Sequence, residues 1–398
     1  MNPATNPTVL IYRSEILPPS ETFIAAQAHA LRRFSPLFAG LRRIRHGLEL
    51  DPEEILVLTR GNTLRDRLRR RVFLETGFET GLEIALAPRF FHLLQLHHPV
   101  LLHAHFAVDA AAALPIHRHL RLPLVVTLHG YDVTSSDAAL RSVAAGRVYL
   151  RRREELFARA SLFLCVSAYL RRKAIDRGFP ESKLRTLPIG VDLSLFAPDP
   201  LRSRSRDPHV LDPIVLFVGR LVEVKGCAYL IRAMSAVQQR HPAARLIIVG
   251  DGPLLDPLRA QARASAASIV FLGSQPPAVV RDLMYRASVL AAPSIVTPAG
   301  NSEALGMVVC EAQAIGLPVA AFRGTGVEEA VADGETALLV PSGDDCALAD
   351  AISAILSDPA FAARLAAAGR LRAETHFSLA EQTARLEDLY AEVLVSRP

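Results

Sequence analysis

The sequence is poor in the features that mark exported, membrane-spanning and metal-binding proteins. It has four cysteines, and their wide spacing fits neither a disulfide framework nor a metal site, so we expect buried free thiols. No run of about 18 apolar residues occurs, which argues against a transmembrane helix. The polar start, residues 1–7, has no basic segment before an apolar run. We therefore expect no signal peptide and a cytoplasmic protein.

Two catalytic signatures are also missing. No Asp-x-Asp pair follows an apolar run, and no His, Cys or Asp cluster has the spacing of metal ligands, so we expect neither a metal nor another cofactor. The glycine fingerprint of nicotinamide dehydrogenases requires three spaced glycines after a strand. The segment from Val249 supplies only Gly250 and Gly252, with Leu255 at the third position, so a dehydrogenase is disfavoured.

Charge is distributed unevenly along the chain. Residues 1–206 contain 30 Lys+Arg and 19 Asp+Glu, a balance of +11, whereas residues 207–398 contain 15 and 21, a balance of −6. This asymmetry predicts that the first half meets an anionic partner, for which we expect a membrane surface and not nucleic acid. An alternative stays open, because 42 of the 45 basic residues are arginine, as in proteins of GC-rich genomes.

Short apolar runs alternate with helical patterns through most of the chain. Such runs, rich in β-branched residues and separated by helices, predict an α/β fold with parallel sheets covered on both faces. The length suits two domains of about 200 residues each. The predicted strands are Thr8–Tyr12, Ile55–Leu58, Val100–His105, Leu124–Leu128, Leu162–Val166, Ile214–Val218, Arg245–Val249, Ile269–Leu272, Ser288–Ala292, Pro318–Phe322 and Ala337–Val340.

A segment with three prolines, residues 196–208, has no apolar period and is predicted to be a linker. We therefore place an N-terminal Rossmann-like domain at residues 1–206 and a second at residues 207–375. Residues 376–398 are predicted to form a C-terminal helix that packs back toward the N-terminal domain. Ligands of doubly wound sheets bind at the carboxyl ends of strands, so we expect two domains facing a central cleft.

The loop after the first strand of the second domain carries two cations. In Val218-Gly-Arg-Leu-Val-Glu-Val-Lys-Gly226, a glycine permits a sharp turn, and Arg220 and Lys225 follow at the strand end. Two fixed cations there would stabilise a diphosphate and its developing charge as a leaving group. Taken alone, however, the pair would more often be a solvated Arg and Lys on a surface loop.

The segment from Pro293 to Val319 is the most informative one. A polar loop follows a strand, and a helix is expected to start near residues 304–306, where free amides suit phosphate. On one continuous helix, Glu303 and Glu311 would lie about 80° apart in azimuth and about 12 Å apart in height. They would contact different hydroxyls of one extended ligand rather than act as an acid–base pair.

These segments together resemble the family 4 retaining glycosyltransferases, which have the GT-B fold of two Rossmann-like domains. The resemblance covers nearly the whole chain and includes Gly316-Leu-Pro-Val319 and Asp333-Gly334. It implies that Arg220 and Lys225 hold the donor diphosphate, Glu303 the donor sugar and Glu311 the ribose. The other donor-binding positions that it implies are Gly252, Gly273, Ser274, Leu305, Gly306 and Met307.

In the first domain the resemblance narrows to exopolysaccharide transferases of the colanic acid and amylovoran type. It rests on Tyr12–Ile24, His103–Ala107 and Thr127–Asp132. It implies that His129 joins Glu303, Arg220 and Lys225 as a catalytic residue. On the acceptor side we place Ser20, Glu21, His105 and Asp132. Many members have a Gly-Gly loop after the first strand, and this chain has Pro18-Pro-Ser-Glu21 instead.

The resemblance implies transfer of a hexose from a UDP- or GDP-linked sugar to a lipid-linked glycan acceptor. It further implies retention of configuration, no metal, and a place in the synthesis of exopolysaccharide or another envelope glycan. Basic clusters at residues 41–45, 65–71, 151–153 and 171–173 predict peripheral contact with the inner membrane face. Two alternatives remain, a GT-B sugar-nucleotide epimerase and a non-enzymatic two-domain sugar-binding protein.

Overall fold

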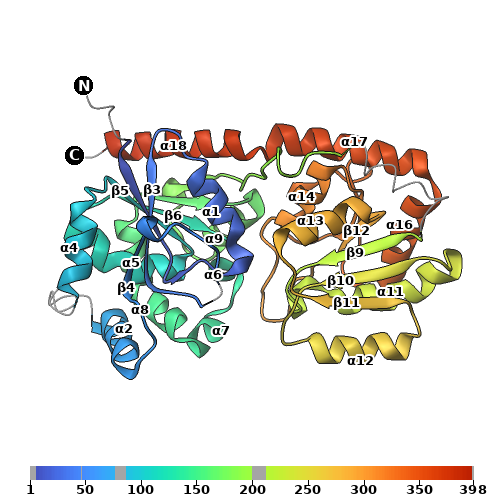
Figure 1. Ribbon diagram of the computed structural model, residues 1–398, viewed down its shortest axis with the longest axis horizontal. Coiled ribbons are helices and arrows are strands. Elements are labelled where there is room, and N and C mark those ends of the chain that lie inside the picture. Colours follow the sequence, from blue (N-terminus) through green and yellow to red (C-terminus); the bar gives the residue numbers. More distant parts are fainter. Residues whose placement is uncertain (1–5, 46, 77–86, 200–211, 397–398) are drawn as a thin grey trace. The chain divides into compact units, whose positions relative to one another are not determined.

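The computed structural model describes residues 6–45, 47–76, 87–199 and 212–396. The chain forms two compact units. Unit 1 consists of residues 1–190 and 379–398, and unit 2 consists of residues 191–378. Figure 1 shows that each unit contains its own sheet with helices packed around it. Both sheets are parallel in all of their described strand pairs, as the alternation of strand and helix patterns predicted.

The sheet of unit 1 is built around β1 and β5, which pair with Val9 opposite Leu101 and Tyr12 opposite Ala104. From β1 the sheet continues through β3 to β4, and from β5 it continues through β6 and β7 to β8. The short strand β2 pairs with the end of β3. The strands are β1 Thr8–Tyr12, β2 Glu15–Ile16, β3 Ser35–Arg43, β4 Ile55–Thr59, β5 Leu101–His105, β6 Leu124–Leu128, β7 Leu162–Cys165 and β8 Leu184–Thr186.

The helices of unit 1 connect these strands, and the last helix of the chain, α18, joins them. Three short 3₁₀ helices, η1 Pro19–Glu21, η2 Pro52–Glu54 and η3 Glu181–Lys183, complete the unit. The α-helices are α1 Thr22–His29, α2 Leu64–Thr76, α4 Pro88–Leu96, α5 Ala107–Leu120, α6 Tyr131–Thr134, α7 Asp137–Ser142, α8 Ala144–Arg159, α9 Ala168–Asp176 and α18 Leu379–Val395.

Unit 2 has the strand order β11-β10-β9-β12-β13-β14. This is the doubly wound Rossmann order, in which the direction of strand addition reverses between the first and fourth strands, here β9 and β12. Its elements are β9 Ile214–Val218, η5 Glu223–Lys225, α11 Cys227–Arg240, β10 Arg245–Val249, α12 Leu255–Ser265, β11 Ile269–Gly273, α13 Pro277–Arg286, β12 Val289–Ala292, α14 Met307–Ile315, β13 Val319–Phe322, α15 Val327–Ala330, β14 Leu338–Val340, α16 Asp345–Ser357 and α17 Pro359–His376.

Burial explains which strands the sequence could reveal. Every residue of β6 and of β13 is buried, because helices cover both faces of a parallel sheet, and such strands are continuous apolar runs. Strand β3 was not predicted. It contains Pro36 and Gly40 and no β-branched residue, yet five of its nine residues are buried between β1 and β4.

The boundaries of the units differ from the predicted ones. Unit 1 ends at Gly190 and not at residue 206, since the following residues pack on unit 2. Val191 pairs with Ser378, and the Tyr285 hydroxyl donates to the carbonyl oxygen of Ala197 at 2.6 Å. The predicted linker at residues 196–208 lies mostly outside the described residues.

The C-terminal helix α18 belongs to unit 1, and the second boundary falls after Ser378 instead of residue 375. The Glu387 carboxylate accepts hydrogen bonds from the backbone amides of Arg32 and Arg33, at 2.8 and 2.6 Å. The ring of Tyr390 is fully buried and packs edge-on against Phe34 at 5.4 Å. These contacts bring the last helix onto residues that follow α1.

Within the described residues, no single helix is long and apolar enough to cross a membrane. Helices α16 and α17 together reach the required length and hydropathy, but they bend by 101° at the break between them.

Backbone contacts join the two loops at the reversal point of unit 2. The Ile295 amide, after β12, donates to the carbonyl oxygen of Val224, after β9, at 2.9 Å. Gly226 has φ +63°, and a Cβ there would lie 1.8 Å from the carbonyl oxygen of Pro293. Only a glycine therefore fits where the turn bearing Lys225 meets the end of β12.

We predict that Gly226→Ala destabilises unit 2 far more than Gly334→Ala. Both glycines are left-handed, at φ +63° and +75°, but nothing lies within 4 Å of a Cβ at Gly334. Gly334→Ala is the control, and its backbone strain should lower the free energy of unfolding by about 1–2 kcal/mol. Gly226→Ala adds a clash of the kind that costs about 1–3 kcal/mol more. Urea unfolding of both variants measures the difference, and equal losses would show that the close approach at Pro293 relaxes freely.

Candidate functional site

The candidate site of unit 2 is at the carboxyl ends of β9 and β12. The loop after β9 carries Arg220 and Lys225, and the loop after β12 carries Glu303. Because β9 and β12 are adjacent parallel strands, both loops leave the same edge of the sheet. Helices on opposite faces follow the two strands there, which is where doubly wound sheets bind ligands.

Lys225 and Glu303 form an ion pair, with side chains that are 21% and 19% exposed. Two residues that the sequence placed on the donor are thus brought together from positions far apart in the chain. The amide of Gly326 donates to the Glu303 carbonyl oxygen at 2.9 Å, which holds the loop in place. Lys225, Glu303, Ser294 and Gly306 line a small hollow whose remaining walls are apolar.

The side chain of Arg220 is exposed and has no hydrogen-bond or ion-pair partner among the described residues. Gly306 caps α14 in the left-handed region at φ +84°, and the helix starts at Met307. The first amides of the helix have no acceptor within it, so they are available to an anion. Leu305 is buried, whereas Met307 is half-buried.

Glu311 lies in the second turn of α14, beyond the first free amides. Burial raises the pKa of its carboxyl from 4.5 to about 7. The carboxyl group of Glu311 has no hydrogen-bond partner among the described residues, so its oxygens are open to a hydrogen-bond donor of a ligand. Glu303 lies before the helix begins, so the spacing calculated for one continuous helix does not apply to the two carboxylates.

The remaining predicted donor positions lie along the same edge of the sheet. Gly273 ends β11, and its carbonyl oxygen accepts from the Gly250 amide at 2.8 Å. A Cβ on Gly252 would lie 2.5 Å from the carbonyl oxygen of Leu221 in the loop after β9. Ser274 is exposed beside Gly273. The ends of β9, β10 and β11 and the loops after β9, β10, β11 and β12 therefore carry the predicted donor residues of unit 2, apart from Met307 and Glu311, which lie in α14.

In unit 1, His129 follows β6 and is surrounded by other rings. Its Nε2 lies 2.9 Å from Nδ1 of His105, so one of the two rings donates and the other accepts. The ring centroids of Phe106 and Phe23 are 4.6 and 5.1 Å from that of His129. Burial, with nearby Arg13 and His103, lowers the pKa of His129 well below 6.5, and the imidazole is neutral.

His105 and Asp132, predicted on the acceptor side, are engaged within the protein. His105 bonds to His129, as above, and burial lowers its pKa strongly. The Asp132 carboxylate accepts the amides of Ala107, Gly130 and His129 at 2.8, 3.0 and 3.3 Å. Burial nevertheless raises the pKa of Asp132 to about 6. Asp132 thus holds the loops that follow β5 and β6.

The other two predicted acceptor-side residues lie in the short helix η1. Ser20 is exposed there. Glu21 is buried and accepts two hydrogen bonds from the guanidinium of Arg13, at 2.6 and 2.8 Å. Arg13 also pairs with Asp109. Arg13 and Asp109 were not predicted, although Arg13 directly follows the first apolar run, a position that the strand-end rule could have singled out.

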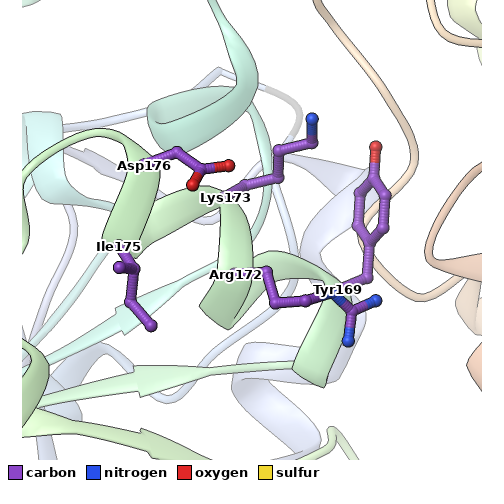
Figure 2. A pocket seen from close by; sticks show the side chains of 5 residues that line it. All are labelled: Tyr169, Arg172, Lys173, Ile175 and Asp176. Atoms are coloured by element: carbon purple, nitrogen blue, oxygen red, sulfur yellow. The ribbon is translucent and has the colours of Figure 1, made fainter.

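A second hollow lies on α9 of unit 1 and contains none of the predicted residues. Figure 2 shows its five lining side chains, all from this one helix. Lys173 lies over the ring of Tyr169, with Nζ 5.8 Å from the centroid. We assign this hollow no function, because charges of both signs line it.

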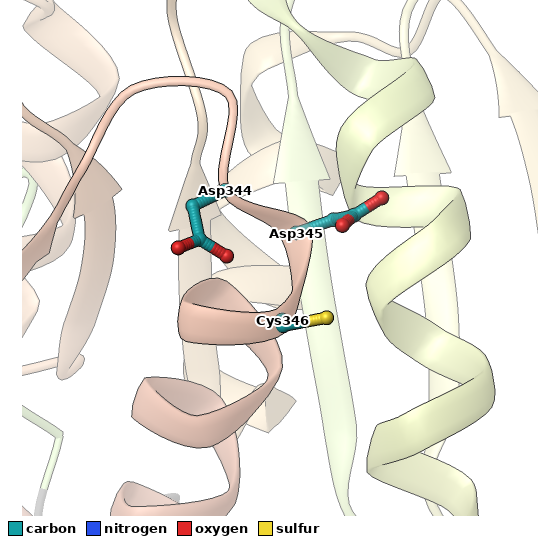
Figure 3. A group of neighbouring side chains, drawn as sticks. All are labelled: Asp344, Asp345 and Cys346. Carbon is teal, nitrogen blue, oxygen red and sulfur yellow. The ribbon is translucent and has the colours of Figure 1, made fainter.

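One group of side chains in the described part of the chain is close enough to share a metal ion, Asp344, Asp345 and Cys346 (Figure 3). Asp344 caps α16 by accepting the Ala347 amide at 2.9 Å, and Asp345 pairs with Arg232. The group is therefore explained as a helix start.

The cysteines follow the prediction in part. Cys165, Cys227 and Cys310 are buried free thiols, and burial raises the pKa of the first two to about 12. The prediction was wrong for Cys346, which is exposed. It lies in the first turn of α16, where the apolar face of the helix turns away from it.

Comparison with known proteins agrees with this arrangement of two doubly wound units. A model of the family "Glycosyl transferases group 1" matches residues 203–372, and a model of "Glycosyltransferase Family 4" matches residues 41–195. Two Rossmann-like units, with cations at the reversal point of the second, are features of sugar-transferring enzymes with the GT-B fold. The chain belongs to family 4 of the glycosyltransferases.

Relatives of known activity act on mannosides and inositol phosphate. The chain is 36% identical over 272 residues to a GDP-mannose-dependent α-(1-6)-phosphatidylinositol monomannoside mannosyltransferase of Mycolicibacterium smegmatis, covering 67% of this chain and 69% of the relative. It is 32% identical to a D-inositol 3-phosphate glycosyltransferase of Acidothermus cellulolyticus, covering 67% and 61%. The narrower resemblance to colanic acid and amylovoran transferases stays a prediction.

Solved structures share the fold. HepE of Anabaena, in complex with UDP and glucose, superposes with a TM-score of 0.74 at 22% identity, covering 96% of this chain and 99% of HepE. Sucrose-phosphate synthase of Thermosynechococcus elongatus superposes with a TM-score of 0.73 at 22% identity, covering 98% and 100%.

We predict that His103→Gln weakens the acid sensitivity of unit 1. His103 is buried between Tyr390 and Thr127, and burial lowers its pKa to about 3. Below pH 6.5 the imidazole of His103 binds a proton in the unfolded chain but stays neutral in the folded protein. The free energy of unfolding therefore falls as the pH falls. Removing the imidazole should flatten this slope by up to about 1.4 kcal/mol per pH unit.

The measurement is urea unfolding of the wild type and the variant between pH 7.5 and 4.5. Asp132→Asn provides a control of opposite sign. The pKa of Asp132 is raised to about 6, so this group favours the folded state as the pH falls toward 4, and its removal should steepen the slope. Parallel slopes for the wild type and His103→Gln would contradict the prediction.

Proposed function

We propose that this glycosyltransferase moves a hexose from a nucleoside diphosphate sugar to a hydroxyl of a lipid-linked glycan during synthesis of an envelope glycan. Unit 2 holds the donor, and unit 1 holds the acceptor. The donor base is guanine or uracil, because the mannosyltransferase relative is GDP-mannose-dependent and HepE binds UDP.

The observation that supports this proposal most directly is the Lys225–Glu303 pair at the reversal point of unit 2. A diphosphate beside Lys225 and the exposed Arg220 would meet two cations and the first amides of α14. Release of Lys225 to the phosphate would free the Glu303 carboxylate for sugar hydroxyls. Glu311, one turn further along the helix, has an acceptor open for the ribose.

We propose retention of configuration because the chain belongs to family 4, and independence of metal because of the cations at the site. Arg220 and Lys225 supply the positive charge that a divalent metal would otherwise bring to the leaving diphosphate. His129 is neutral and bonded to His105, which suits hydrogen bonding to the donor sugar rather than nucleophilic attack. A front-face reaction, in which the leaving phosphate takes the proton of the acceptor hydroxyl, needs no further base.

We also propose that α2 docks unit 1 on an anionic membrane surface. Leu64 and Leu68 lie one turn apart on this helix and are 81% and 61% exposed, beside exposed Arg65, Arg67 and Arg71. A basic helix with exposed leucines can lie on an anionic membrane surface, with the leucines inserted and the arginines near headgroups.

The other predicted basic clusters are less suited to docking. Arg152 is buried and donates to the carbonyl oxygens of Ala111 and Leu74, at 3.1 and 2.7 Å. Arg42 pairs with Glu15, and Arg171 pairs with Glu181. Some of the basic residues at 41–45, 151–153 and 171–173 are thus engaged within the fold, and we assign the surface role to α2.

We expect Glu303→Ala and Lys225→Ala each to lower kcat by about 10²–10³ while the protein stays folded, because each loses one electrostatic contact to donor or leaving group. Arg232→Ala is the matched control, since it breaks the exposed Arg232–Asp345 pair of the same unit and should leave kcat close to wild type. Steady-state kinetics with a panel of nucleotide sugars and a membrane extract measure the effect.

A charge-swapped double variant, Lys225→Glu with Glu303→Lys, separates catalysis from folding. The swap keeps an ion pair, so stability should recover relative to the single variants while turnover stays low. Recovery of both stability and turnover would mean that the pair serves only the fold.

Activity should persist in excess EDTA, since Arg220 and Lys225 provide the cations that face the leaving group. The assay compares initial rates with EDTA, with added magnesium and with added manganese. Complete loss in EDTA that either metal restores would contradict metal independence.

Co-sedimentation with vesicles tests the docking of α2. The wild type should pellet with anionic vesicles at 0.1 M salt and be released at 1 M, because the Debye length falls from about 10 Å to about 3 Å. Leu64→Ser with Leu68→Ser should abolish pelleting, whereas Leu371→Ser, which changes a 60% exposed leucine of unit 2, should not. Equal, negligible binding of the wild type to anionic and neutral vesicles would refute docking.

A further inference from the structure

The carboxyl end of β1 in unit 1 carries a cluster of one cation and two carboxylates, Arg13, Glu21 and Asp109. Arg13 follows β1, and Asp109 lies in the first turn of α5, which follows β5. Since β1 and β5 are adjacent and the strand order of unit 1 reverses between them, the cluster occupies the ligand-binding position of this sheet.

The backbone fixes Arg13 at this position. Its amide donates to the carbonyl oxygen of Ala39 at 3.1 Å. Gly40 follows Ala39 in β3, and a Cβ on Gly40 would lie 2.1 Å from the carbonyl oxygen of Arg13. The unpredicted strand β3 therefore carries a glycine where the main chain of Arg13 passes.

The guanidinium of Arg13 is held on three sides. Nε and one terminal nitrogen donate to the two oxygens of Glu21 at 2.8 and 2.6 Å, and the other terminal nitrogen pairs with Asp109. The guanidinium carbon lies 4.4 Å from the centroid of the Phe106 ring. Such a bidentate, stacked arginine has few N–H groups left for a new ligand.

The cluster has a formal charge of −1, since two carboxylates surround one guanidinium. The imidazoles of His105 and His129 add no positive charge to the cluster, because both are neutral at physiological pH. An anionic ring substituent would meet like charge here, although residues 1–206 as a whole carry a balance of +11.

A vacant acceptor completes the cluster. Asp109 is 4% exposed, and its Oδ2 accepts the Ser14 amide at 3.2 Å and pairs with Arg13, but Oδ1 has no partner among the described residues. A carboxylate oxygen is satisfied by an O–H donor. Phe106, which stacks on Arg13, also packs against the ring of His129, and His129 packs against Phe23, so aromatic rings adjoin the cluster.

We propose that Arg13, Glu21 and Asp109 form an acceptor subsite for an uncharged polyhydroxyl ring, a hexose or cyclitol without phosphate, and that its two carboxylates exclude a phosphorylated ring. The proposal rests on the proposed function, in which unit 1 holds the acceptor. It distinguishes between the two kinds of relative, one acting on a mannoside and the other on inositol 3-phosphate.

Ring binding is read by saturation-transfer NMR in the presence of GDP or UDP, so that it does not depend on turnover. The probes are methyl α-mannoside with its 6-phosphate, and myo-inositol with inositol 3-phosphate. The wild type should bind the uncharged member of each pair at least about tenfold more tightly, since a phosphate would face uncompensated carboxylate charge. Equal binding, or tighter binding of the phosphorylated members, would overturn the proposal.

Glu21→Gln should remove most or all of this preference. It removes one negative charge and releases N–H groups of Arg13, so the ratio of uncharged to phosphorylated affinity should fall by at least about tenfold. Glu15→Gln is the matched control, because Glu15 pairs with Arg42 in the same unit but is 47% exposed and outside the cluster. Its ratio should equal that of the wild type.

A structural role for Glu21 would lower both affinities and the melting temperature together and leave the ratio unchanged, which would also overturn the proposal. The proposed function fails in a different way, by absence of GDP and UDP binding in calorimetry. Selective binding of the uncharged rings would support the subsite in that case as well.

Discussion

The close approach of two loops at the reversal point of unit 2 is the constraint on which its candidate site depends. At the reversal point the helices that follow β9 and β12 go to opposite faces of the sheet, so the loops after these two strands would diverge without further contacts. Gly226 against the Pro293 carbonyl, and Ile295 bonded to Val224, hold the loops together. Lys225 therefore meets Glu303, although Glu303 lies on irregular chain that no helical period positions.

The sequence predicted those parts of the fold that burial makes conspicuous. Fully covered strands such as β6 and β13 are continuous apolar runs, and the cations after β9 stand out beside a glycine. Strand β3 was not predicted because a segment with Pro36 and Gly40 has little β propensity. Its burial comes from the strands on both sides of it. Arg13 and Asp109 were not predicted as site residues because only the strand order of the sheet brings them together.

In the N-terminal half of the chain, net charge and local charge favour different ligands. The +11 balance of residues 1–206 predicts attraction to anionic surfaces, and α2 has the exposed leucines and arginines for it. Some other arginines are engaged within the fold, as the buried Arg152 and the paired Arg42 show. Electrostatic fields between exposed charges act over roughly the Debye length. The selectivity of the proposed subsite depends instead on groups in contact with the ligand, where two carboxylates surround Arg13.

Burial also decides what His129 can do. His103, His105 and His129 lie in a row, with ring centroids 4.3 and 5.2 Å apart, and desolvation lowers the pKa of all three. With Nε2 bonded to His105, the ring of His129 has only Nδ1 left for a ligand. In the proposed reaction, a neutral imidazole with one free nitrogen would orient a sugar hydroxyl but would not balance the charge of a leaving diphosphate. The proposal therefore assigns that charge to Arg220 and Lys225, and the acceptor proton to the leaving phosphate.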